Sequence, residues 1–134
     1  MLPQPSSSST AASASRGPLC ARNVHATRLA SGSPNGRWSV ELGLNGEVVD
    51  VHRRRFEKKG ITPNGEAWGG LLEQCLAKTW PADIHLDPEA GALHAWVESD
   101  ASKDYLVAAM CRAVDDAAWL DRCLASIDRS KLDD

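Results

Sequence analysis

The sequence predicts an α+β domain in which helices cover one face of an antiparallel sheet. Two observations favour this class. Apolar residues recur with helical spacing between Trp68 and Trp80, and they alternate with polar residues in short segments on both sides of that stretch. Short turn sequences separate the alternating segments, which is typical of strands that pair with their neighbours. The expected element order is ββααββαα, with the helix inside residues 60–80 as the central packing element.

The length and composition of the chain fit one globular domain. It has 134 residues, of which 43% are hydrophobic and 25% charged, so an apolar core is expected. No segment approaches the roughly 20 consecutive apolar residues that span a bilayer, and no membrane partner is expected.

The first 36 residues differ from the rest of the chain. They are rich in Ser, Ala and Pro, carry three arginines and no acidic residue, and show no hydrophobic period. We therefore expect a disordered tail over residues 1–36 and a single α+β domain over residues 37–134. The same composition also fits a transit peptide, or a start codon assigned too far upstream.

The domain is expected to open with a β-hairpin. Apolar and polar residues alternate from Trp38 to Leu44, which is the pattern of a half-buried strand. Asn45-Gly46 is a strong two-residue turn signal, because both positions accept a positive φ. Residues 47–51 are therefore predicted to return as the second strand. The basic run after them is expected to form a short helix that ends at Gly60.

The central helix follows a run of helix breakers that ends at Gly65. Its apolar stripe consists of Trp68, Leu71, Leu72, Cys75, Leu76, Thr79 and Trp80, of which only Thr79 is polar. Trp68 begins the stripe and is expected in the core. Pro81 should end the helix, since it disfavours the α conformation at Trp80.

A second hairpin is predicted around Pro88–Gly91. A four-residue loop would pair Asp87 with Ala92 and place one set of apolar residues on the core face: Ile84, Leu86, Leu93, Ala95 and Val97. Two helices should follow. The first begins at Ser99-Asp100, which are good capping residues, and Asp115-Asp116 separates it from the second.

The other face of the second hairpin is the candidate partner-binding surface. Strand alternation places five residues there: His85, Asp87, His94, Trp96 and Glu98. An outward tryptophan with a polar rim has the composition of an interface anchor. The alternative is that a helix or the N-terminal tail covers this face and makes Trp96 part of the core.

Two motifs resemble the immunity protein 51 family of bacterial polymorphic-toxin systems. One is GITPNGEAWGGLL, with Gly60, Asn64, Gly65 and Trp68, and the other is the Asp87–Gly91 segment DPEAG between two strands. The resemblance covers roughly residues 37–128. It implies a cytoplasmic, non-enzymatic protein without a cofactor that binds and neutralises a cognate toxin.

Charge adds an expectation about that partner. The whole chain has a net charge of −3 and its first 36 residues carry +3, which leaves −6 on residues 37–134. An acidic domain favours a basic protein partner and disfavours nucleic acid, since phosphate contact needs cations. The basic run of residues 53–59 is the exception. It fits either a nucleic-acid patch or a solvated helix face, and we expect the second.

No catalytic motif is present. The chain lacks G-x-S-x-G, a P-loop and H-E-x-x-H, so no catalytic residue is assigned. His85, Asp87 and His94 share a sheet face and would suit a metal, but such residues are usually ordinary polar strand positions, and no metal is expected.

The cysteines are Cys20, Cys75, Cys111 and Cys123, with no C-x-x-C spacing among them. We expect reduced thiols in a cytosolic protein and no disulfide framework. Three functions stay open at this point. They are a toxin inhibitor, which we favour, an adaptor or regulatory domain without a toxin, and an enzyme whose site the motifs do not show. The oligomeric state is not predicted.

Overall fold

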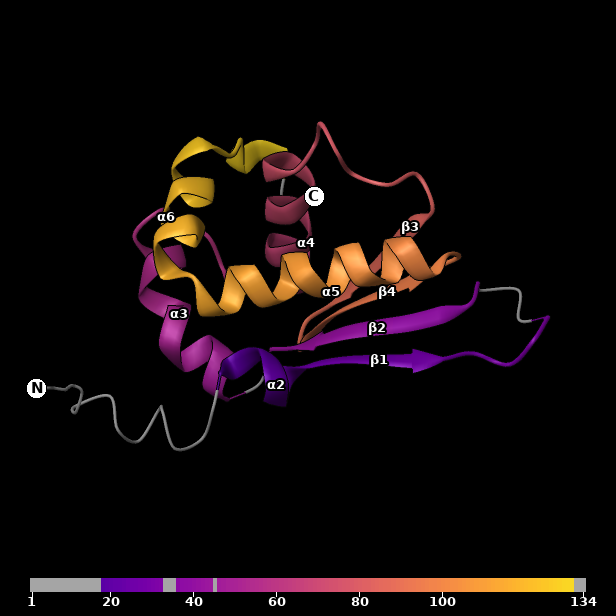
Figure 1. Ribbon diagram of the computed structural model, residues 1–134. Helices are drawn as coiled ribbons and strands as arrows, with labels where there is room; N and C mark the ends of the chain where they lie inside the picture. Colours follow the sequence, from indigo (N-terminus) through magenta and orange to yellow (C-terminus); the bar gives the residue numbers. More distant parts are fainter. Residues whose placement is uncertain (1–17, 33–35, 45, 132–134) are drawn as a thin grey trace, which may run out of the picture.

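A computed structural model describes residues 18–32, 36–44 and 46–131 (Figure 1). Its elements are α2 (Leu19–Asn23), β1 (Val24–Arg28), β2 (Trp38–Gly43), α3 (Glu47–Glu57), α4 (Gly65–Cys75), β3 (Ile84–Glu89), β4 (Ala92–Val97), α5 (Asp100–Asp115), α6 (Ala117–Ser126) and the 3₁₀ turn η1 (Arg129–Lys131). The strands form one antiparallel sheet in the order β1-β2-β4-β3. The predicted α+β class is confirmed.

The helices lie on one side of the sheet, as predicted. Figure 1 shows α5 running along one face of the sheet, with α3, α4 and α6 gathered toward one end of it. Val40 and Leu42 of β2, with Leu93, Ala95 and Val97 of β4, turn toward these helices and are buried. The core therefore sits between a single sheet and a single helical layer.

The first predicted hairpin is wrong in its second half. Residues 47–51 belong to α3 and not to a strand. Val48, His52 and Phe56 are the buried residues of this helix and recur every four positions, so the helical stripe runs without a break through the basic segment. Asn45 lies outside the described residues. Gly46 precedes the helix and has a φ of 76°. The positive φ therefore belongs to the residue before a helix and not to a hairpin turn.

The predicted end of this helix at Gly60 is confirmed. The Gly60 amide donates to the carbonyl of Glu57, and the Ile61 amide donates to that of Phe56. This is the Schellman arrangement, in which the residue after the cap has a positive φ. Gly60 has a φ of 72°, which glycine adopts without strain.

The strand that pairs with β2 on its outer side is β1, from the segment assigned to the tail. For residues 18–32 the prediction of disorder is therefore wrong, while residues 1–17 lie outside the described part. The Asp115 carboxylate accepts hydrogen bonds from the Leu19 and Cys20 amides. Arg22 forms an ion pair of 2.9 Å with Glu47 of α3. Leu19, Cys20 and Val24 also pack against the core. These apolar residues follow no helical or alternating period, so local pattern did not reveal the segment.

Helix α4 is shorter than its stripe predicts. It begins after Asn64, whose side-chain oxygen accepts a hydrogen bond of 2.9 Å from the Ala67 amide, and it ends at Cys75. Leu76 and Thr79 continue as turns, and Trp80 packs edge-on against Tyr105 with ring centroids 6.1 Å apart. The apolar spacing persists beyond the helix because the following turns still rest on the core.

The second hairpin forms with a register two residues away from the prediction. Glu89 pairs with Ala92 and Asp87 with His94, so the connection is Ala90-Gly91 and not a four-residue loop. A slip of two residues leaves every side chain on its predicted face, because side chains alternate with a period of two. The expected cap of α5 is in place, and Asp116 is a further cap that was not predicted. Ser99 accepts from the Ser102 amide, and Asp116 accepts from the Trp119 amide.

The cysteines lie in two close pairs, an arrangement that was not expected from the sequence. Cys20 lies at disulfide distance from Cys111, and Cys75 from Cys123, with Cα–Cα distances of 4.8 and 5.6 Å. Both separations lie in the range that a disulfide bridges. The first pair joins α2 to α5 and the second joins α4 to α6. Sequence spacing could not show this, because the partners are 91 and 48 residues apart.

Trp68 lies at the centre of the helical layer, as predicted, with no exposed surface. Its ring contacts Phe56 of α3 at a centroid distance of 4.9 Å and meets His52 edge-on at 5.8 Å. The ring therefore joins α4 to α3.

Replacing Trp68 with Ala should lower the free energy of unfolding by about 3–5 kcal/mol, the usual cost of truncating a buried aromatic residue. Urea unfolding followed by circular dichroism measures this loss. Trp80→Ala is the matched control, because Trp80 is only partly buried, and it should cost clearly less. Equal losses in the two variants would contradict the central position of Trp68.

His52 lies on the buried side of α3, with 2% of its surface exposed. Its Nε2 lies 2.8 Å from the carbonyl oxygen of Val114, which can only accept, so Nε2 carries the proton and Nδ1 the lone pair. Burial away from water lowers the pKa of His52 below 6.5 and outweighs the opposing hydrogen bond to Val114. The ring is therefore neutral in the folded protein at neutral pH.

Acid should weaken the fold through His52. Below about pH 6.5 this histidine becomes protonated in the unfolded chain, while in the folded protein it stays neutral down to its lower pKa. The free energy of unfolding therefore decreases as the pH falls from about 6.5 toward the folded pKa. Thermal melts at about pH 7.5 and about pH 5.5 test this in the parent and in His52→Gln, which keeps an N–H donor for Val114. We expect a smaller acid-induced fall in Tm for His52→Gln than for the parent. His85→Gln, at an exposed position, should behave like the parent.

Candidate functional site

The face of the sheet turned away from the helices is a continuous polar surface. We define the open face as the outward residues of the four strands together with Glu98, which follows β4. Its members, from their register, are His25, Thr27, Ser39, Glu41, His85, Asp87, Glu89, His94, Trp96 and Glu98. All five residues predicted as a partner-binding surface lie on it.

The predicted residues are brought together by β3 and β4. His85 lies opposite Trp96 in the register, and its Nε2 is 3.0 Å from a carboxylate oxygen of Glu98. His94 lies opposite Asp87, with 3.9 Å between Nδ1 and Oδ2. The His94 and Trp96 rings meet edge-on at a centroid distance of 4.7 Å. Trp96 is therefore held between two histidines on a rigid sheet, and about half of each rim side chain, apart from His94, is exposed.

Strands β1 and β2 contribute residues that sequence reasoning missed. Glu41 lies beside His94 in the register, and His25 lies beside Glu41 on the next strand. Ser39 Oγ is 2.7 Å from Nε2 of His94. The outward direction of Ser39 and Glu41 was predicted, but their pairing with β4 is a long-range contact that local pattern does not reveal. His25 lies in the segment assigned to the tail.

The open face is acidic. The strands and Glu98 place four carboxylates on it: Glu41, Asp87, Glu89 and Glu98. The strands contain one Lys or Arg residue, Arg28, and its guanidinium lies over the Trp38 ring at 5.4 Å. Trp38 donates its indole N–H to Asp100 of α5, so this cation lies on the helical side. Arg37, which precedes β2, lines a hollow together with Glu98, so one cation borders the face at that edge.

Ser39, His94 and Asp87 lie in the order of a hydrolase triad. The Ser39–His94 contact is short enough for proton transfer, whereas the His94–Asp87 contact of 3.9 Å is longer than a hydrogen bond. An acyl-transfer site also needs donors aimed at the developing oxyanion. Strand β2 pairs with β1 and with β4, so the amides around Ser39 lie in the plane of the sheet and do not point over the face. The arrangement fixes the direction of the His94 ring.

The two motifs that carry the family resemblance meet in space. Gly65, at the first turn of α4, lies against the backbone of Glu89 and Ala92, and a Cβ atom at position 65 would overlap both. Both residues of this Asn-Gly pair therefore have a structural role. Asn64 caps the helix, and Gly65 leaves room for the turn between β3 and β4.

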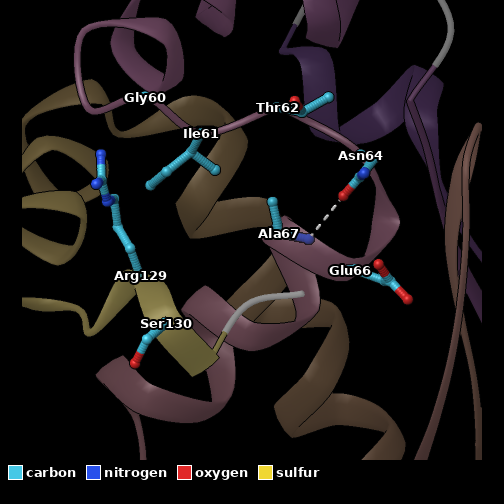
Figure 2. A pocket seen from close by; sticks show the side chains of 8 residues that line it. All are labelled: Gly60, Ile61, Thr62, Asn64, Glu66, Ala67, Arg129 and Ser130. Carbon is cyan, nitrogen blue, oxygen red and sulfur yellow. Dashed lines mark hydrogen bonds between the residues drawn. The ribbon is translucent and has the colours of Figure 1, made fainter. Parts of the chain in front are cut away.

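A hollow of about 420 Å³ lies beside this contact (Figure 2). Loop residues Gly60–Asn64 form one side of it, α4 contributes Glu66 and Ala67, and η1 contributes Arg129 and Ser130. Figure 2 shows Arg129 extending from η1 toward Gly60, and Glu66 on the side of α4. With one carboxylate and one guanidinium, the hollow has no dominant charge that would define a ligand.

No metal-binding cluster is visible in the part of the chain that the structure describes. Within those residues, no three His, Cys, Asp or Glu side chains are arranged to hold a metal ion. His85 turns to Glu98, while His94 turns to Ser39 and Asp87. No described helix combines the length and apolar character that crossing a membrane requires.

Comparison with family models, with curated proteins and with solved structures gives no match to this chain.

Proposed function

We propose that this domain is an inhibitor that binds a cognate protein toxin through the open face and neutralises it without catalysis. The observation that carries the proposal is the outward position of Trp96 on a sheet face that none of the described helices covers. Its neighbours His85 and His94 are held by hydrogen bonds or ion pairs to residues of the same face. A large ring in a prearranged polar surround loses little conformational freedom on binding.

The charge of the open face supports a basic partner. Glu41, Asp87 and Glu98 are spread across it, and the one arginine of the strands lies on the opposite side. Complementary charge mainly raises the association rate and selects the partner, while buried aromatic contacts set the dissociation rate. The proposed complex therefore has Trp96 near its centre and the carboxylates at its rim.

The resemblance to immunity protein 51 supplies the biological setting of the proposal. Its motifs form the contact between α4 and the β3–β4 turn, which positions the strand that carries Trp96. The second candidate is an adaptor or regulatory domain that uses the same face for a partner other than a toxin. Co-expression with the product of an adjacent toxin gene separates the two, since only an inhibitor restores growth.

Replacing Trp96 with Ala should weaken partner binding by about 2 kcal/mol or more, as for an interface hot spot. The melting temperature should change little, because the ring packs on the outer side of the sheet. Isothermal titration with the co-expressed toxin measures affinity, and growth rescue reports inhibition in cells. Val51→Ala is the control. Val51 lies on α3, is 52% exposed and is outside the open face, so its loss should leave binding unchanged. A folded Trp96→Ala protein with full binding would remove the open face from the proposal.

We propose the cytoplasm as the site of inhibition, on the strength of the resemblance alone. The paired cysteines favour the opposite environment, since disulfides persist in oxidising compartments and are rare in the cytosol. In the cytoplasm, Cys20 and Cys111 would lie side by side as thiols, as would Cys75 and Cys123.

Thiol trapping in intact cells tests the location. Rapid acid quenching followed by a maleimide of large mass should add label at all four cysteines if the cytoplasm is the site, because reducing systems keep thiols free there. The same protein after exposure to an oxidant should take up no label, which serves as the control for pairing. Unlabelled protein from unoxidised cells would contradict the cytoplasmic site and leave the binding proposal intact.

A further inference from the structure

A second charged surface lies away from the open face, at the end of α3. A hollow of about 460 Å³ is lined by Arg54, Arg55, Lys58, Lys59, Asp121 and Leu124. We call it the basic groove. Four of its six lining residues are cations, although the chain as a whole is acidic. The groove lies between the last turn of α3 and helix α6.

The positive charge of the basic groove is only partly neutralised within the described structure. Asp121 is the one carboxylate of the lining, and it lies 3.0 Å from the Arg55 Nε atom. None of the contacts found in this part of the chain joins Arg54, Lys58 or Lys59 to a carboxylate. Arg53, by contrast, reaches Asp50 at 4.0 Å on the same helix and does not line the groove.

The spacing of the cations concentrates this charge. Arg54 and Arg55 lie in the last turn of α3, and Lys58 and Lys59 lie in the turn that follows it. The four cations therefore gather around the end of the helix. The carbonyl groups at the C-terminal end of a helix attract cations. A guanidinium from elsewhere in the chain already binds there, because Arg129 donates a hydrogen bond to the Lys59 carbonyl.

We propose that the basic groove binds the phosphate chain of a small polyphosphorylated anion. Two arginines and two lysines around one hollow supply the directional donors and point charges that phosphate oxygens accept. The groove has no aromatic side chain in its lining on which a base could stack, so recognition is of the phosphates. This site is independent of toxin binding at the open face.

Calorimetric titration with inorganic triphosphate tests the proposal at low ionic strength. We expect saturable binding of one triphosphate per chain. The double variant Arg54→Gln with Lys58→Gln should weaken it at least about tenfold, since each lost cation removes one phosphate contact. Arg53→Gln, which removes one positive charge from the same helix outside the groove, should stay within about twofold of the parent. Asp121→Asn should strengthen binding, because it removes the carboxylate that competes for Arg55.

ATP and inorganic triphosphate distinguish the source of the phosphates. Equal affinity identifies the free phosphate chain as the ligand, and tighter binding of ATP identifies a nucleotide. Either result supports the proposed site if the double variant binds that ligand more weakly than the parent does. Heats that do not saturate, or an equal loss in Arg53→Gln, would overturn the proposal. Tighter binding of a short DNA duplex than of triphosphate would also overturn it, since the surface would then be a nucleic-acid contact.

Discussion

The contact between Gly65 and the β3–β4 turn determines how the two layers of this domain fit together. The first turn of α4 approaches the backbone of Glu89 and Ala92 so closely that no side chain is accommodated at position 65. Asn64 fixes where that turn begins, because its side chain caps the Ala67 amide. Helix and hairpin are thus joined backbone to backbone, which permits little relative movement.

From this contact the rest of the helical layer follows. One turn beyond Gly65, Trp68 enters the core and packs on Phe56 and His52, which places α3. Cys75, at the end of α4, lies against Cys123 and places α6. The β3–β4 hairpin held at the same contact carries Trp96 on its far side. The residues that hold the layers together therefore lie on one face of the strands, and the open-face residues lie on the other. Changes at the open face need not disturb the core.

The fold class and the shared sheet face of the five predicted surface residues were predictable, because both depend on local periodicity. The cap at Ser99 was predictable from residue type. Sequence pattern failed where long-range pairing decides the outcome. Asn45-Gly46 favours a hairpin, but Val48, His52 and Phe56 bury a helical stripe, and the burial of three large side chains outweighs a turn preference. Likewise β1 has four exposed residues out of five, and only its pairing with β2 reveals it as a strand. The wider open face, with His25 and Glu41, could not be predicted before that pairing was known.

The distribution of charge explains how an acidic domain can offer two unlike surfaces. The open face collects carboxylates around Trp96, while the basic groove collects cations at the end of α3, and the apolar core lies between the sheet and the helices. At physiological ionic strength the field of exposed charges is screened within about 8 Å, so each surface acts on a ligand through its own residues and not through the net charge of the chain. A partner that approaches the open face therefore meets a locally negative surface with an aromatic centre. An anion that approaches the groove meets a locally positive one, and the acidity of the whole protein excludes neither.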